Sequence, residues 1–161
     1  MEKLKRVVIK EELVALTGDF VKAALLNQLL YWSERVKDFD KFIEEEKSRK
    51  ELNGETFNLH KQNGWIYKSA EELSEETMLA LTPKSIRTHL KYLIDKGWID
   101  ERNNPEYKWD RTKQYRVNIV KLYRDLKELG YNLEGYEDLR SDAESSDQVE
   151  KITNGTGNRK Q

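Results

Sequence analysis

A run of cationic and hydroxyl side chains lies close together in the middle of the chain. Its members are Lys84, Ser85, Arg87, Thr88 and Lys91. A guanidinium can donate two hydrogen bonds to guanine O6 and N7, so Arg87 is the side chain best suited to read a base. Lysine and hydroxyl groups bind bases or phosphates less selectively. The alternative is that Arg87 and Lys91 only solvate one face of a helix, as most such charges do.

A second group of cations follows further along the chain: Lys108, Arg111 and Lys113. When a protein binds a nucleic acid, cations outside the base-reading helix typically contact phosphates, and these contacts add affinity more than specificity. Two carboxylates, Glu106 and Asp110, are interleaved with them and favour the alternative of local ion pairs. Trp109, at the centre of this group, either makes a contact at the tip of this segment or belongs to the hydrophobic core, and we favour the core.

Enzyme chemistry finds little support in the sequence. The two histidines, His60 and His89, lack metal-ligand spacing to a partner, and the chain has no cysteine. There is no phosphate-cradling loop and no dinucleotide fingerprint. We therefore expect a protein that is not an enzyme and that uses no metal and no cofactor. His89 is either a DNA-facing residue or an ordinary, partly exposed helical one.

Both basic groups fall within a distinctive order of elements: strand, helix, turn, helix and β-hairpin. The segments that carry it are residues 64–69, 70–81, 82–97 and 98–118. In the helix expected within residues 82–97, four apolar residues form the face opposite the cations: Ile86, Leu90, Leu93 and Ile94. This order is typical of a winged helix-turn-helix, which most often lays its third helix in a DNA groove. The sequence thus predicts an α+β, mostly helical fold of this kind with additional N-terminal helices.

Capping residues mark the ends of these two helices. Ser69 and Glu72 form an S-x-x-E capping box. Thr82 is a good N-cap, and Pro83 suits the first helical position, where its missing N–H costs nothing. Gly97 supplies a left-handed stop. We also count the capping residues Ser69 and Thr82 among the expected DNA contacts.

The N-terminal part is expected to be helical after a short strand. Residues 4–9 resemble an edge strand, and residues 10–16 one or two helical turns. Asp19 is a plausible N-cap for a long helix that begins at Phe20. From there to Trp32 apolar residues occur nearly all round, which is typical of a helix buried on every side. We interpret it as the central scaffold helix.

Beyond that point the helix narrows to a single apolar seam. The seam consists of Leu25, Leu29, Trp32, Val36, Phe39 and Ile43. Its spacing of four and three is typical of a coiled-coil contact. Two interpretations remain open: packing on the C-terminal helix of the same chain, or pairing with a second copy, which we slightly favour. Residues 44–60 are polar and are expected to form a loop.

The C-terminal part predicts one amphipathic helix over residues 119–129, stopped at Gly130. Residues 134–161 are polar and acidic, with little to bury, and are expected to be disordered. The expected organisation is an N-terminal helical extension (1–60), a winged helix-turn-helix with its C-terminal helix (64–133) sharing one core with it, and the tail.

Charge is distributed unevenly along the 161 residues, although the net charge is only −1. Between residues 82 and 118 nine basic residues oppose five acidic ones, whereas seven acidic residues oppose four basic ones from residue 134 onward. The local field, not the total, steers a polyanion. No apolar run approaches the roughly 20 residues of a membrane span, and no signal peptide is present. We therefore expect a cytoplasmic protein without a membrane partner.

Four stretches carry a family resemblance: AALLNQLLYWSERV, GWIYKSAEEL, LTPKSIRTHLKYLIDKGWI and NPEYKWDRTKQYRVN. Together they resemble the N-terminal winged-helix domain of replication proteins from phages and prophages of Gram-positive bacteria, which are similar to initiator and DnaD-like primosomal proteins. The resemblance covers about residues 7 to 122. The string WDRT-x-x-Y is its most distinctive part. Many of those proteins continue into a larger domain for loading partners or helicase, where this chain has a short acidic tail.

The resemblance implies a bacterial DNA-binding protein of phage, prophage or plasmid type that acts in replication initiation. Its implied partners are double-stranded DNA, a second copy of the chain through the N-terminal helices, and replication proteins. Two alternatives stay open. One is a transcriptional regulator with the same fold. The other is a winged-helix interaction module of a primosome-like assembly without useful DNA affinity, which the near-neutral net charge favours.

Overall fold

The computed structural model describes residues 3–54 and 61–136, and the chain divides into two compact units, 1–118 and 119–161. The first unit contains α1 (Glu11–Thr17), α2 (Phe20–Leu52), β1 (Ile66–Tyr67), α3 (Ala70–Thr77), α4 (Pro83–Asp95), β2 (Ile99–Arg102) and β3 (Gln114–Val117). The second contains α5 (Ile119–Glu128). The fold is mixed α+β, with about 55% of the described residues in helices, which confirms the predicted class. The predicted division into domains stays a prediction.

The three strands form one antiparallel sheet in the order β1-β3-β2. Ile66 of β1 pairs with Tyr115 of β3, and Ile99 of β2 pairs with Val117. All four side chains are buried, so they form the core face of the sheet. The predicted strand at residues 4–9 is wrong, because this segment pairs with neither edge of the described sheet and leaves Leu4 exposed.

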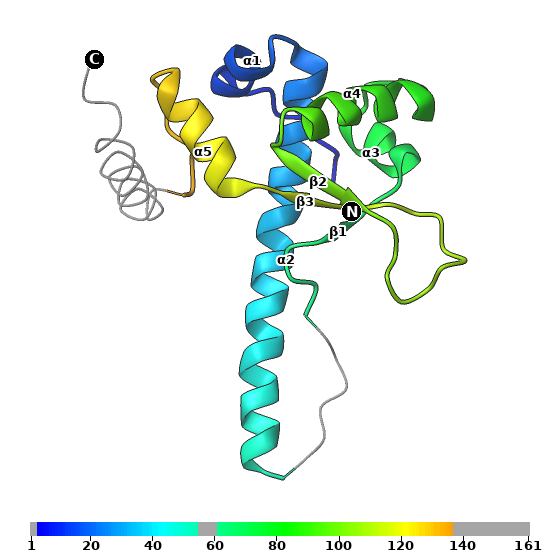
Figure 1. The fold of residues 1–161 in the computed structure, drawn as a ribbon, viewed down its shortest axis with the longest axis vertical. Helices are drawn as coiled ribbons and strands as arrows, with labels where there is room; N and C mark the ends of the chain where they lie inside the picture. Colours follow the sequence, from blue (N-terminus) through cyan, green and yellow to red (C-terminus); the bar gives the residue numbers. More distant parts are fainter. Residues whose placement is uncertain (1–2, 55–60, 137–161) are drawn as a thin grey trace, which may run out of the picture. The chain divides into compact units, whose positions relative to one another are not determined.

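Helix α2 is the scaffold of the first unit. Its N-cap is Asp19, whose Oδ1 accepts a hydrogen bond from the N–H of Val21, as predicted. Figure 1 shows α1, α3 and α4 around the N-terminal half of α2, while the C-terminal half extends beyond the sheet. The middle of the N-terminal half is buried on all sides, but Phe20 and Tyr31 are exposed.

Helix α2 continues to Leu52, so the loop predicted from residue 44 is wrong. Residues 44–52 are mostly straight-chain helix formers, and no glycine or proline occurs between residue 44 and Gly54. Glu46 and Arg49, which lie one turn apart, form an ion pair that stabilises this part of the helix. The helix ends where Gly54 adopts a left-handed conformation. The rest of the predicted loop, residues 55–60, lies outside the described residues.

The apolar seam of α2 is largely covered by its own chain. Leu25, Leu29, Val36 and Ile43 are buried. Trp32 is half-buried, and Phe39 is exposed. Most of the predicted dimer contacts therefore offer little surface to a second copy, and the homodimer stays a prediction.

Helix α3 ends earlier than the predicted residue 81. It stops at Thr77, because Met78 adopts a left-handed conformation and Ala80 does the same two residues later. Side-chain hydrogen bonds hold this turn: Thr77 Oγ1 donates to the carbonyl of Leu73, and Ser74 Oγ donates to that of Leu81. Such bonds offer the backbone an alternative to continued helix.

The second unit begins with α5, which confirms the predicted C-terminal helix. Leu122, Tyr123 and Leu126 are its buried residues. The helix ends at Glu128, two residues before the predicted stop at Gly130, which adopts a left-handed conformation (φ 89°). The tail from residue 137 lies outside the described residues. In the described part of the chain no single helix is long and apolar enough to cross a membrane, although α1 and α2 together reach that length and hydropathy across a 120° bend.

Candidate nucleic-acid interface

Helix α4 presents the first predicted basic group on its exposed face. Lys84, Arg87, Thr88 and Lys91 are exposed, and Ser85 is half-buried. The opposite face buries Ile86, Leu90 and Leu93. The predicted capping is confirmed: Thr82 accepts a hydrogen bond from the N–H of Ser85, and Pro83 occupies the first turn.

Carboxylates lie close to two of these cations. Arg87 is 3.6 Å from Glu71 of α3, and Lys91 is 3.1 Å from Asp95 one turn along α4. Both pairs are largely exposed, so each contributes little to stability and can exchange for a phosphate. Lys84 enters no ion pair within residues 3–54 and 61–136. Part of the helix charge is therefore neutralised in the free protein.

A groove of about 220 Å³ joins the start of α3, the exposed face of α4 and the residues that lead into β3. It is lined by Lys68, Ser69, Ala70, Glu71, Arg87, Arg111, Thr112, Lys113 and Tyr115. We call it the basic groove, because four of these residues are cations and only Glu71 is acidic. It brings together the predicted contacts Ser69, Arg87, Arg111 and Lys113 from three separate segments. The other predicted DNA contacts, Thr82, Lys84, Ser85, Thr88, Lys91 and Lys108, do not line it.

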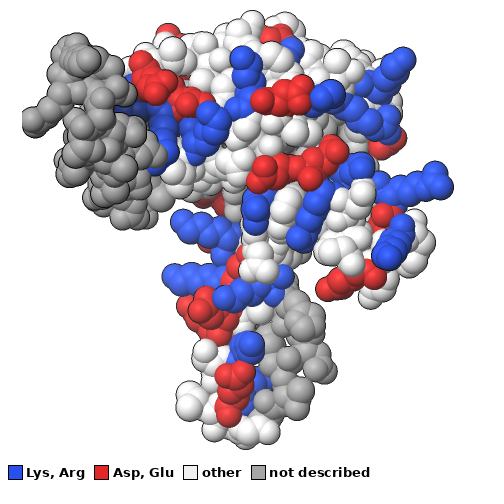
Figure 2. Space-filling model, viewed as in Figure 1, with Lys and Arg blue, Asp and Glu red and all other residues white. Residues whose placement is uncertain are grey.

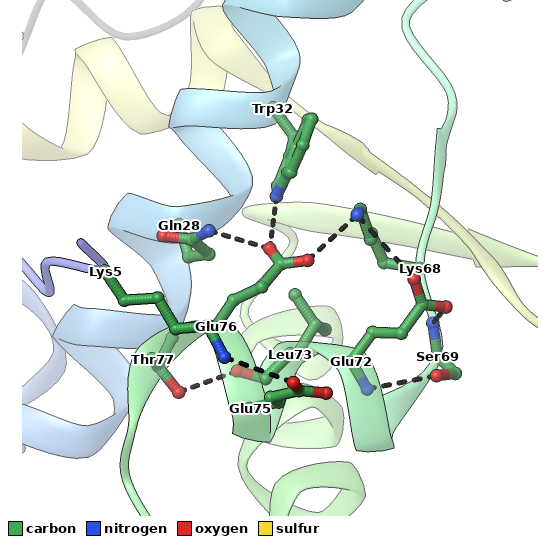
Figure 3. A network of polar contacts seen from close by, with 10 residues as sticks. All are labelled: Lys5, Gln28, Trp32, Lys68, Ser69, Glu72, Leu73, Glu75, Glu76 and Thr77. Carbon is green, nitrogen blue, oxygen red and sulfur yellow. Dashed lines mark hydrogen bonds and ion pairs between the residues drawn. The ribbon is translucent and has the colours of Figure 1, made fainter. Parts of the chain in front are cut away.

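A polar network anchors the α3 side of this groove to α2 (Figure 3). The carboxylate of Glu76 accepts hydrogen bonds from Gln28 Nε2 at 2.8 Å and Trp32 Nε1 at 2.6 Å, and its other oxygen lies 2.9 Å from Lys68 Nζ. Burial raises the pKa of Glu76, but hydrogen bonds from Lys68, Trp32 and Gln28 outweigh it, so the pKa lies below the ordinary 4.5.

Lys68 links this network to the groove. Its ammonium lies 4.0 Å from the centre of the Trp32 ring, besides its contact with Glu76, and its side chain lines the groove. The capping box follows at once: Ser69 Oγ accepts the N–H of Glu72, and Glu72 accepts the N–H of Ser69. Sequence reasoning found the capping box but missed Lys68 and Glu76, because nothing local in the sequence pairs them.

Asp110 organises the connection between β2 and β3. Its carboxylate accepts hydrogen bonds from the hydroxyl of Tyr67, the N–H of Thr112 and the side-chain amide of Asn104. The Tyr67 hydrogen bond, followed by that of Thr112, holds the pKa of Asp110 below its usual value, and the same bond raises the pKa of Tyr67. The carboxylate of Asp110 therefore binds β1 and the β2–β3 connection itself. Among the described residues, no ion pair joins it to Lys108, Arg111 or Lys113.

Trp109 lies outside the core, so the expected burial is wrong. Its side chain is 78% exposed. Residues 103–113 lie between the two strands, where Asn104 and Asp110 close the connection on itself. The strand alternation that buries Tyr115 therefore does not reach back to Trp109.

His89 faces α2 instead of solvent. Its Nδ1 lies 3.1 Å from Lys22 Nζ and 3.5 Å from the carboxylate of Asp19. Burial, and then the charge of Lys22, lower the pKa of His89 against the opposing effect of Asp19. His89 is therefore neutral at pH 7 and accepts a hydrogen bond from Lys22.

We expect the free energy of unfolding to fall as the pH drops below about 6.5, the ordinary pKa of histidine. Because the folded-state pKa of His89 is lower, the unfolded chain binds the proton first, so stability is full above that pH and declines below it. Urea denaturation from pH 7.5 to 5.5 measures this. His89→Gln should flatten the decline. A decline as steep in His89→Gln as in the unmodified protein would remove the role of His89.

Acidic and basic side chains are interspersed over the face seen in Figure 2, which shows no broad surface of a single charge. No cluster of residues suited to hold a metal ion occurs in the described ranges. Comparison with family models, with curated proteins and with solved structures finds no match to this chain.

Proposed function

We propose that residues 64–118 form a winged helix-turn-helix that binds double-stranded DNA. In this assignment α4 is the recognition helix and the β2–β3 connection is the wing. The observation that carries the proposal is the basic groove, where Lys68, Arg87, Arg111 and Lys113 converge from three segments of the chain. Cations that converge at a helix face are suited to follow a phosphate backbone.

In this proposal α4 and the β2–β3 connection make different contacts with the DNA. Arg87 is 60% exposed, and releasing its pair with Glu71 frees the guanidinium to reach a base edge. Lys84 and Thr88 lie on the same exposed face and contact bases or phosphates beside it. Arg111 and Lys113 bind phosphate from the wing side and set the orientation of the protein on the duplex.

The biological role follows from the resemblance to phage and prophage replication proteins. We propose a cytoplasmic bacterial protein of phage, prophage or plasmid type that acts in replication initiation, as a non-enzymatic homodimer without a cofactor. The bound site, at an origin or at a promoter, separates this role from transcriptional regulation.

A second candidate function is a protein-interaction module without useful DNA affinity. It is favoured by the carboxylates beside Arg87 and Lys91, which already neutralise part of the helix charge. Folds of this kind host several functions. The two candidates differ in one measurable property, the affinity for duplex DNA at low salt.

The test is fluorescence anisotropy of a labelled duplex titrated with the protein across a salt series. Each phosphate contact lowers the slope of log affinity against log salt by about 0.9, so three or four groove cations should produce a slope of roughly −3 to −4. A slope in this range would support the DNA-binding assignment. Absence of binding at low salt would overturn it and favour the interaction module.

A further inference from the structure

Two large aromatic side chains are exposed together on the β2–β3 connection. Trp109 is 78% exposed and Tyr107 is 53% exposed, and their ring centres lie 5.7 Å apart at an interplanar angle of 49°. We call this pair the aromatic tip. Figure 1 shows the connection projecting away from the sheet. Burying such rings is favourable, so a pair left in water indicates a surface that a ligand covers.

Hydrogen bonds hold the connection in a defined conformation around the tip. Asn104 Oδ1 accepts the N–H groups of Glu106 and Tyr107 at 3.0 and 3.2 Å. The N–H of Asp110 donates to the carbonyl of Tyr107 at 3.1 Å, and Tyr67 anchors the carboxylate of Asp110. Because the backbone on both sides of Trp109 is already ordered, little conformational entropy of this segment is lost when a ligand covers the rings.

Both signs of charge adjoin the aromatic tip in sequence, but the carboxylate of Asp110 is already held by Tyr67, Thr112 and Asn104, which leaves Glu106 beside two cations. Lys108 lies between the two aromatic residues in sequence, and Arg111 follows Trp109 by two positions. Neither cation enters an ion pair with any residue that the structure describes. Rings for base faces combined with cations for phosphates are the two components of single-strand binding surfaces. This charge complementarity selects a nucleic acid over an apolar protein partner.

We propose that the aromatic tip stacks on unpaired bases, so that the protein prefers duplex DNA carrying a single-stranded extension. The proposal rests on the proposed DNA binding and adds the form of DNA that is bound. Arg111 lines the basic groove and is two residues from Trp109 in sequence, so the aromatic tip lies within two residues of the proposed duplex site. Two rings tilted by 49° cannot enter one base step of a duplex together, whereas unpaired bases adjust to each ring.

The experiment compares three labelled probes: a blunt duplex, the same duplex with a single-stranded oligothymidine extension, and oligothymidine alone. The extension should tighten binding on the order of 10-fold, the usual scale for a stacked base. Trp109→Ala should abolish this gain and leave the affinity for the blunt duplex unchanged. Trp109→Phe should keep part of the gain while losing the tryptophan quenching that stacking on the indole produces.

Phe42→Ala is the matched control, since it removes an exposed aromatic side chain from α2 and should preserve the preference for the extension. A gain that persists in Trp109→Ala would overturn the stacking proposal and leave the proposed DNA binding intact. Equal weakening on blunt and extended probes would place the indole on duplex DNA and also overturn it. Binding of the extended probe alone, lost in Trp109→Ala, would support stacking while contradicting duplex binding. Binding to no probe would overturn both proposals.

Discussion

Reversing the charge of Arg87 and Arg111 together should weaken binding to duplex DNA on the order of 10²-fold at about 0.1 M salt. The lost phosphate contact of Arg111 alone removes about 0.9 from the salt slope. The lost base contact of Arg87 costs about 1–3 kcal/mol on the specific sequence, and the new carboxylates add repulsion. Both arginines line the basic groove but come from different segments, so the double variant tests the groove as a unit. Anisotropy across a salt series measures both the affinity and the slope.

The matched control reverses Lys41 and Lys47, two exposed cations on the C-terminal half of α2. It changes the net charge by the same amount but lies beyond the sheet (Figure 1). Its affinity for DNA should stay close to that of the unmodified protein. Equal losses in the two double variants would mean that only the total charge matters, and the groove would lose its assignment.

Arg87→Ala alone separates base reading from phosphate binding. A bidentate contact to guanine contributes about 1–3 kcal/mol of discrimination, so the loss should be confined to the specific sequence. A phosphate contact instead costs all sequences equally and reduces the salt slope by about one. Unchanged binding to every DNA would remove α4 from the interface.

Glu76→Ala should lower the free energy of unfolding by about 2 kcal/mol, because it leaves Trp32 and Gln28 without their acceptor and leaves Lys68 only its longer pair with Glu72, at 3.7 Å. The side chains of Glu76 and Lys68 are only 21% and 19% exposed, so solvent screens this contact weakly. Urea denaturation at pH 7 measures the change. Glu75→Ala is the matched control: its exposed pair with Lys5 should contribute less than about 1 kcal/mol.

The cost of Glu76→Ala should also depend on pH. Because the pKa of Glu76 is lowered on folding, its stabilising effect is present above the unfolded value of about 4.5 and is lost as the pH falls through the folded value. The difference between the two proteins should therefore shrink under acid conditions. A difference that is the same at pH 7 and pH 3 would show that the carboxylate charge contributes nothing.

Local signals accounted for the helix N-termini. Asp19, Ser69 and Thr82 each accept a backbone N–H two or three residues ahead, so the capping geometry is complete within a single turn. The same local reasoning was wrong where a segment lacked a clear end. It predicted that α2 ends before residue 44, although the left-handed residue that ends the helix is Gly54. It also predicted that α3 continues to residue 81, beyond the turn at Met78.

Burial was harder to predict than helix or strand. Periodicity identified the apolar seam of α2 but did not show whether the same chain or a second copy covers it. Most of the seam is buried within the single chain. Trp109 shows the opposite error. An aromatic residue between strands is usually assigned to the core, but this one lies on a connection closed by Asn104 and Asp110 and stays in water.

The sequence by itself determined the order of elements from residue 64 onward, the N-caps of α2, α3 and α4, and the two basic groups, because these depend on residues within a few positions of one another. Only the tertiary structure decided that Lys68, Arg87, Arg111 and Lys113 share one groove, since they come from segments that the sheet and α2 bring together. It also decided that Glu76 of α3 meets Lys68 and Trp32 of α2. Contacts between residues far apart in sequence depend on packing, which no local pattern specifies.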